Sequence, residues 1–255
     1  QAFYLEYLDY LDEARVKWVR CGYLRRLAEA GSTMVRYQEV PASEAVVGRL
    51  GFPRARGDPK HRFVLSHPWL SKEHPDPNGT KLQILVQQLD LLGAFDDDAI
   101  FIDYMGLPQN NKTDPELQRL ERENLMPKPG EHPAVRTEAE EPSFRNALGS
   151  MELMYSVCST AVILLPMDDE VTADKEYLSR GWCFFEFCIA FSSGNLANAS
   201  VLPPEEQMCK KVAELKADTV EGFHKGFRAT QFTSNGDRAV VTELFEQILK
   251  KKPRQ

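Results

Sequence analysis

The chain has 255 residues, of which 42% are hydrophobic and 27% are charged, and its formal net charge is -7. This composition is typical of a globular domain, and the negative charge disfavours nucleic-acid binding as the main role. The longest apolar run, Ala161 to Leu165, is too short to span a bilayer.

The N-terminal segment, residues 2–30, has apolar residues at helical spacing and ends at Gly31. Residues 31–60 lose that spacing and are rich in proline and glycine, which predicts a connection with one short strand around residues 34–40. We therefore expect residues 1–60 to form a helical extension and a linker.

Short apolar segments then alternate with segments of helical periodicity. This alternation predicts an α/β fold in which helices cover both faces of a parallel sheet. The predicted strands are residues 62–66, 99–103 and 160–165, and the predicted helices are residues 80–92, 143–156 and 180–191.

A long polar insert, residues 110–142, separates the second strand from the second helix. A connection of this length is usually functional or mobile, and we expect a mobile one with a helical turn near residues 117–125. The C-terminal segment, residues 203–255, predicts two helices, 205–217 and 238–250, packed on the core.

Polar and aromatic residues follow the predicted strands where each ends. The segments are Ser66-His67-Pro68-Trp69, Asp103 to Gln109 and Leu165 to Asp168. In a doubly wound sheet, ligands bind beyond the carboxyl ends of the strands. We therefore expect a binding site at these strand ends.

One carboxylate, Glu186, lies among apolar residues at the start of the third helix; its neighbours are Phe184, Phe185, Phe187 and Ile189. A carboxylate in such surroundings costs free energy unless it is paired, hydrogen-bonded or protonated. Groups of this kind are enriched at functional sites. A structural carboxylate paired with Arg180 or Arg62 is the alternative.

Three segments resemble one known family. Phe63-Val64-Leu65-Ser66-His67 is similar to the first strand of Toll/interleukin-1 receptor (TIR) domains. Ile102 to Gln109, an Ile-Asp-x-x-x-x-Pro-Gln pattern, and Arg180-Gly181-Trp182-Cys183-x-x-Glu186 resemble the related fungal heterokaryon-incompatibility (HET) domains more closely. The resemblance covers about residues 61–202 and implies a flavodoxin-like, three-layer parallel sheet with extra N- and C-terminal helices.

In many TIR domains, the glutamate of this motif cleaves NAD between nicotinamide and ribose. The resemblance thus implies that Glu186 is catalytic, that NAD is the substrate, that the ribose product is hydrolysed or cyclised, and that no metal is needed. A preorganised carboxylate can stabilise an oxocarbenium-like ribose electrostatically. The candidate NAD-binding residues are Ser66, His67, Trp69, Asp103, Gly106, Arg180 and Trp182.

The resemblance also implies self-association or binding to a TIR-type partner, in an immune or cell-death response. A non-enzymatic assembly module is the alternative function, and a nucleotide glycosyl-transferring enzyme ranks third. The scattered, odd set of five cysteines favours a reducing, cytoplasmic location.

Two further clusters have simpler explanations. His61, His67 and His74 match no zinc-binding spacing, and we expect solvated loop histidines. Asp96-Asp97-Asp98 could bind a cation, but a solvated helix end before a strand is the more common arrangement.

Overall fold

The computed structural model describes residues 2–48, 62–156, 161–164, 177–197, 210, 212–232 and 236–251. Its contacts divide the chain into two compact units. The first unit comprises Gln1–Phe63 and Trp69–Leu148, and the second comprises Val64–Pro68 and Gly149–Gln255. The boundaries predicted at residues 60 and 202 stay a prediction, because both positions lie outside the described residues.

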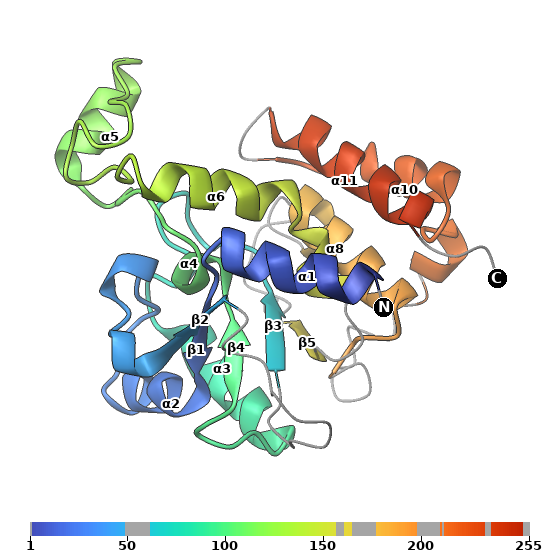
Figure 1. The fold of residues 1–255 in the computed structure, drawn as a ribbon, viewed down its shortest axis with the longest axis horizontal. Helices are drawn as coiled ribbons and strands as arrows, with labels where there is room; N and C mark the ends of the chain where they lie inside the picture. Colours follow the sequence, from blue (N-terminus) through green and yellow to red (C-terminus); the bar gives the residue numbers. More distant parts are fainter. Residues whose placement is uncertain are drawn as a thin grey trace. The chain divides into compact units, whose positions relative to one another are not determined.

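The first unit contains the antiparallel part of an open, mixed sheet. Strand β1 (Lys17–Arg20) pairs antiparallel with β2 (Ala45–Val47) on one side and with β4 (Ala99–Phe101) on the other (Figure 1). Strand β3 (Arg62–Ser66) follows β4 in the strand order, and its residues are shared between the two units. The antiparallel pairing of β1 corrects the prediction of a purely parallel sheet.

The predicted helix over residues 2–30 is interrupted by this strand. Helix α1 (Ala2–Glu13) ends in a turn in which Arg15 has a φ of 49°, and α2 (Cys21–Glu29) begins directly after β1. The consecutive residues Trp18 and Val19 are both fully buried. A strand buried on both faces shows no alternation, so its apolar residues fitted the helical spacing as well.

The linker after α2 has two short 3-10 helices, η1 (Tyr37–Glu39) and η2 (Ala42–Glu44), before β2. The prediction of a strand around residues 34–40 is therefore wrong. The predicted helix over residues 80–92 is confirmed as α3 (Thr80–Leu91), where the buried Asp76 carboxylate accepts hydrogen bonds from two backbone N–H groups of the first turn. The strand predicted to reach residue 103 ends at Phe101, and α4 (Asp103–Gly106) follows.

The insert predicted as a mobile connection has regular structure. Its helix α5 (Pro115–Arg122) is capped by the Asp114 carboxylate, which accepts from the Leu117 backbone N–H at 2.9 Å. Leu117 packs with Ala134 and Val135 in a small apolar cluster. Helix α6 (Glu140–Gly149) begins within the last residues of the insert and continues beyond it.

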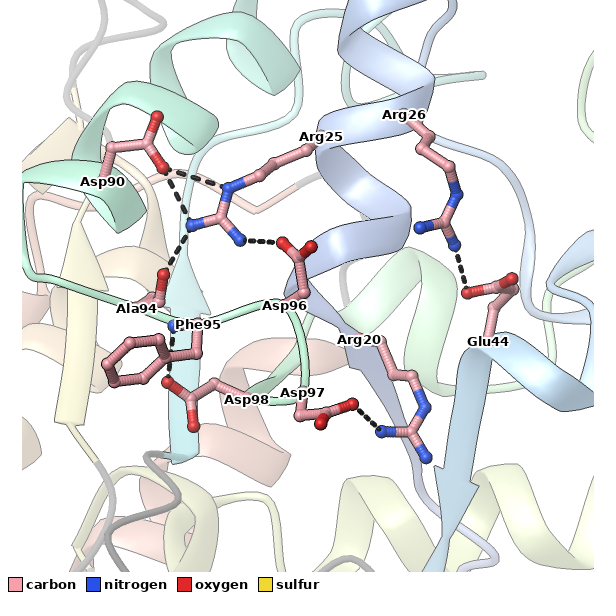
Figure 2. A network of polar contacts seen from close by, with 10 residues as sticks. All are labelled: Arg20, Arg25, Arg26, Glu44, Asp90, Ala94, Phe95, Asp96, Asp97 and Asp98. Atoms are coloured by element: carbon pink, nitrogen blue, oxygen red, sulfur yellow. Dashed lines mark hydrogen bonds and ion pairs between the residues drawn. The ribbon is translucent and has the colours of Figure 1, made fainter.

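Arginines of the first unit neutralise the acidic turn before β4 (Figure 2). Arg25 lies 2.8 Å from Asp90 and 2.6 Å from Asp96, and Arg20 lies 3.3 Å from Asp97. Asp98 is buried and accepts from the Phe95 backbone N–H. Asp96 and Asp97 therefore join α2 and β1 to the turn, a role that the sequence did not predict.

In the second unit, β5 (Ala161–Leu164) lies next to β3, and α8 (Gly181–Ser192) follows the 3-10 helix η5 (Tyr177–Ser179). Within the described residues, β5 confirms the predicted strand 160–165, and α8 confirms the predicted helix 180–191 with a shift of one residue at each end. The helix predicted over residues 143–156 breaks after Gly149, and α7 (Glu152–Ser156) is separate.

Two C-terminal helices, α10 (Val220–Phe227) and α11 (Asp237–Lys251), pack on α8 and on each other (Figure 1). Helix α11 confirms the predicted helix 238–250, whereas α10 was not predicted. Most of the first half of the predicted helix 205–217 lies outside the described residues. Among the described residues, no helix is long and apolar enough to cross a membrane.

Candidate functional site

Helix α8 places Glu186 on its one partly exposed stripe. From Gly181 to Ala190, every residue is buried except Trp182 and Glu186, which are each partly exposed. These two residues are four apart and so lie on the same helix face. The helix is otherwise apolar because it packs against α7, α10 and α11. Glu186 is thus a carboxylate at the edge of a buried helix.

A hydrogen bond from Ser66, the last residue of β3, holds the Glu186 carboxylate. The Ser66 hydroxyl donates a hydrogen bond to Oε2 of Glu186, and Ser66 Oγ lies 2.6 Å from the Tyr177 hydroxyl. Ser66 is fully buried and Tyr177 is almost so. The structure therefore brings together two of the residues predicted for the site, Ser66 and Glu186.

The phenylalanines around Glu186 belong to an aromatic core. Phe184 packs against Phe223 and Phe227, with ring centroids 5.6 and 6.4 Å apart, and Phe185 lies 6.4 Å from Phe223. The Phe223 ring in turn stacks on Phe245 of α11. The bulk that the sequence places beside Glu186 is thus used to attach the C-terminal helices to α8.

Trp182 is tied to the start of α11. Its indole Nε1 donates to the Asp237 carboxylate at 3.0 Å, and its ring meets Phe185 edge-on. A buried or half-buried indole N–H normally has such a partner. Trp182 therefore joins two helices, and its other ring atoms are what a ligand could contact.

The residues before Trp182 pair with the segment that follows α10. The Gly181 N–H donates to the Gln231 carbonyl at 2.9 Å, and the Gln231 N–H donates to the Ser179 carbonyl at 2.7 Å. Arg180 forms a parallel bridge with Gln231 and is the N-cap of α8. A side chain at position 181 would collide with Phe232, since a Cβ there would lie 1.9 Å from the ring.

Two of the other predicted site residues, Trp69 and Asp103, contact each other within the first unit. Trp69 Nε1 donates to the Asp103 carboxylate at 3.0 Å, and the Trp69 ring meets Tyr104 edge-on at 5.4 Å. The Lys112 ammonium of the insert lies over the Trp69 ring, 5.6 Å from its centre. Trp69 and Asp103 are both partly exposed, so this cluster presents an aromatic ring, an anion and a cation.

Gly106 and two of the histidines are packing residues. Gly106 is buried, and a Cβ there would lie 2.6 Å from Phe101. His67 is buried at the end of β3. His74 accepts from the Asp76 backbone N–H through Nδ1, and its Nε2 lies 3.0 Å from the Met34 carbonyl oxygen. His67 is therefore not the solvated loop histidine that the sequence predicts, whereas His74 is a partly exposed loop histidine, and His61 lies outside the described residues.

Tyr177 is the residue of this site that the sequence analysis missed. It lies in the same segment as the motif, two residues before Ser179, and its hydroxyl reaches Ser66. Nothing in the spacing marks it, because the contact joins residues 111 positions apart. Within the described residues, no group of His, Cys, Asp and Glu side chains is arranged to hold a metal ion.

No family model, no curated protein and no solved structure matches this chain.

Proposed function

We propose that this chain cleaves NAD between nicotinamide and ribose, with Glu186 as the catalytic carboxylate. The observation that carries the proposal is the hydrogen bond from Ser66 at the end of β3 to Glu186. It places a carboxylate at the carboxyl end of β3, a strand with a neighbour on each side, and α/β folds bind ligands at such strand ends. The motif resemblance of Arg180 to Glu186 supplies the reaction.

The strand order supports the finer fold that this function requires. Counted from β3, the neighbouring strands β4, β3 and β5 have the order 2-1-3, with which flavodoxin-like sheets begin. In such sheets the ligand lies where the strand order reverses, here between β3 and β5. We accordingly propose a flavodoxin-like, TIR-like core to which β1 and β2 are added.

The chemistry needs one well-placed anion. The bond between ribose C1′ and the nicotinamide nitrogen breaks with its electron pair going to nicotinamide, which leaves as a neutral molecule. The ribose becomes oxocarbenium-like, and a fixed carboxylate stabilises that positive charge. Water then bonds to C1′ and releases a proton, or a ring nitrogen of the adenine bonds there and yields a cyclic product. Glu186, oriented by Ser66, is the candidate for this anion.

The remaining predicted residues keep secondary roles in the proposal. Within the second unit, Trp182 offers a ring surface for stacking, whereas the roles predicted for Trp69, Asp103 and Gly106 of the first unit stay predictions. Arg180 would contribute a cation for the pyrophosphate. His67 lies next to Ser66 at the end of β3. No metal enters this reaction scheme, and we propose a cytoplasmic location.

Self-association is the second proposal, and an exposed apolar pair favours it. Leu91 at the end of α3 is 67% exposed, and Phe95, four residues later, is 70% exposed. Large apolar side chains are exposed at contact surfaces when they form a contiguous patch, and these two residues are close in the sequence. We propose that a second copy of the chain covers them, whether as part of the enzyme or in a purely assembling role.

The test is incubation of the purified protein with NAD at increasing protein concentration, with separation of the products by chromatography. We expect nicotinamide and an equal amount of ADP-ribose or its cyclic form. We also expect the rate per molecule to rise with concentration, and a Phe95→Ser variant to lose that rise. Absence of nicotinamide at every concentration would refute the enzyme and leave the assembling role.

A further inference from the structure

We propose that Tyr177 is a positioning residue for Glu186 and acts through Ser66. The inference rests on the proposed function for its kinetic consequence, but the hydrogen-bond chain on which it depends is a property of the second unit alone. The chain runs from the Tyr177 hydroxyl to the Ser66 hydroxyl and on to the Glu186 carboxylate.

The direction of donation in this series of hydrogen bonds follows from the number of hydrogens on each hydroxyl. A serine hydroxyl carries one hydrogen, and Ser66 donates it to Glu186. The contact of 2.6 Å between Ser66 Oγ and the Tyr177 hydroxyl must then use the hydrogen of Tyr177. Tyr177 thus donates to Ser66, and Ser66 donates to Glu186. Hydrogen bonds in such a series polarise and strengthen one another.

Burial leaves water no easy way to replace the Tyr177 hydroxyl. Ser66 is 0% and Tyr177 is 2% exposed, whereas Glu186 is partly exposed. The series of hydrogen bonds therefore joins two buried hydroxyls to a partly exposed carboxylate, which a ligand can reach. Loss of the inner donor leaves the Ser66 oxygen with one fewer partner and loosens the orientation of its hydroxyl.

The phenol ring is fixed by the helix that carries Glu186. The Tyr177 ring meets Phe187, the next residue after Glu186, edge-on with centroids 6.3 Å apart. The Tyr177 carbonyl accepts from the Arg180 backbone N–H at 3.2 Å, which connects η5 to the cap of α8. A phenylalanine at position 177 keeps this ring contact and removes the hydroxyl alone.

The test compares Tyr177→Phe with Tyr155→Phe. Tyr155 is a matched control, because it is also buried in the second unit and its hydroxyl donates to the carbonyl of Leu65, the residue before Ser66. We expect kcat for nicotinamide release to fall about tenfold in Tyr177→Phe, with KM changed less than about twofold, as expected for loss of a hydrogen bond that orients the catalytic group. Tyr155→Phe should keep the wild-type kcat.

A second measurement does not depend on turnover. The infrared bands of the Glu186 carboxylate are obtained as the difference between the protein and its Glu186→Gln variant. We expect these bands to shift in Tyr177→Phe and to stay in place in Tyr155→Phe. Unchanged bands in Tyr177→Phe, or equal effects of the two tyrosine variants, would overturn the proposal. If the wild-type protein does not cleave NAD, the proposed function fails and the infrared bands alone decide the role of Tyr177.

Discussion

The Ser66 hydroxyl at the end of β3 donates a hydrogen bond to the Glu186 carboxylate of α8, although 120 residues separate them in the chain. This contact fixes a carboxylate at the edge of an otherwise buried helix. It also joins two segments that the sequence analysis connected only through a family resemblance. The predictions below test this arrangement and the fold around it.

Ser66→Ala removes the donor that orients Glu186. We expect the rate of nicotinamide release to fall by about tenfold to a hundredfold, because hydrogen bonds to charged groups contribute about 1.5–3 kcal/mol. Ser66→Thr keeps a hydroxyl and should retain more activity than Ser66→Ala. Steady-state kinetics on the two variants checks this, and equal rates for Ser66→Ala and the wild type would contradict it.

Gly181→Ala places a methyl group where the Phe232 ring lies, 1.9 Å from its nearest atom. We expect a loss of about 1–3 kcal/mol in the free energy of unfolding, as for other overpacked sites, measured by denaturant titration. Gly149→Ala is the control. A Cβ at Gly149, the last residue of α6, meets nothing within 4 Å, so this change should be neutral or slightly stabilising.

Recovery of stability in a double variant would identify the cause. Phe232→Leu should restore part of the loss when combined with Gly181→Ala, because the shorter side chain leaves room for the methyl group. If the losses of the two single variants simply add, the collision with Phe232 is not the source of the effect.

Stability should depend on pH through His74. Burial lowers the pKa of His74 below 6.5, against the opposing effects of the Met34 carbonyl and nearby carboxylates. Its Nδ1 accepts a hydrogen bond, which a protonated ring cannot do. The unfolded chain therefore binds more protons below pH 6.5, and the contribution of His74 to stability is present above pH 6.5 and lost as the pH falls.

The measurement is the unfolding temperature between pH 6.5 and about pH 5 for the wild type and for His74→Gln. We expect a smaller decrease with falling pH in the variant. An NMR titration in which the His74 ring protonates at or above pH 6.5 would contradict this account.

Two buried thiols should be unreactive in the folded protein. Burial, with Asp98 adding to it, raises the pKa of Cys21 to about 12, and burial raises the pKa of Cys188 well above its usual value. Since the thiolate is the reactive form, an alkylating reagent should label these two residues only after denaturant is added. Peptide mapping by mass spectrometry checks this, and rapid labelling of the native protein would contradict it.

The sequence predicts best where a segment is long and has a single pattern. The strand 62–66 was predicted to the residue because it is a short apolar run next to a proline-rich segment, and the helix α3 was predicted almost to the residue because its apolar periodicity is clear. Strand β1 was missed because its adjacent buried residues, Trp18 and Val19, also fit the helical spacing of the segments on either side. Helix α10 was missed because it contains Gly222 and Gly226, and glycine has a low helix propensity.

Both glycines are explained by close packing, which the periodicity of a sequence does not show. A Cβ at Gly222 would lie 2.1 Å from the Leu215 carbonyl oxygen, and one at Gly226 would lie 2.5 Å from the Phe184 ring. Both contacts come from residues outside the helix. The same limit applies to the candidate site, where Glu186 and Ser66 were predicted and Tyr177 was not, since a hydroxyl contact across 111 residues leaves no local signal.

The most direct test of the catalytic role of Glu186 is the rate of nicotinamide release by Glu186→Gln, measured at a protein concentration at which the wild type is active. Glu243→Gln, which removes an exposed carboxylate of α11, serves as the control for loss of one negative charge. We predict that Glu186→Gln loses at least about a hundredfold in rate with an unchanged unfolding temperature, and that Glu243→Gln keeps the wild-type rate. Equal rates for Glu186→Gln and the wild type would contradict the account.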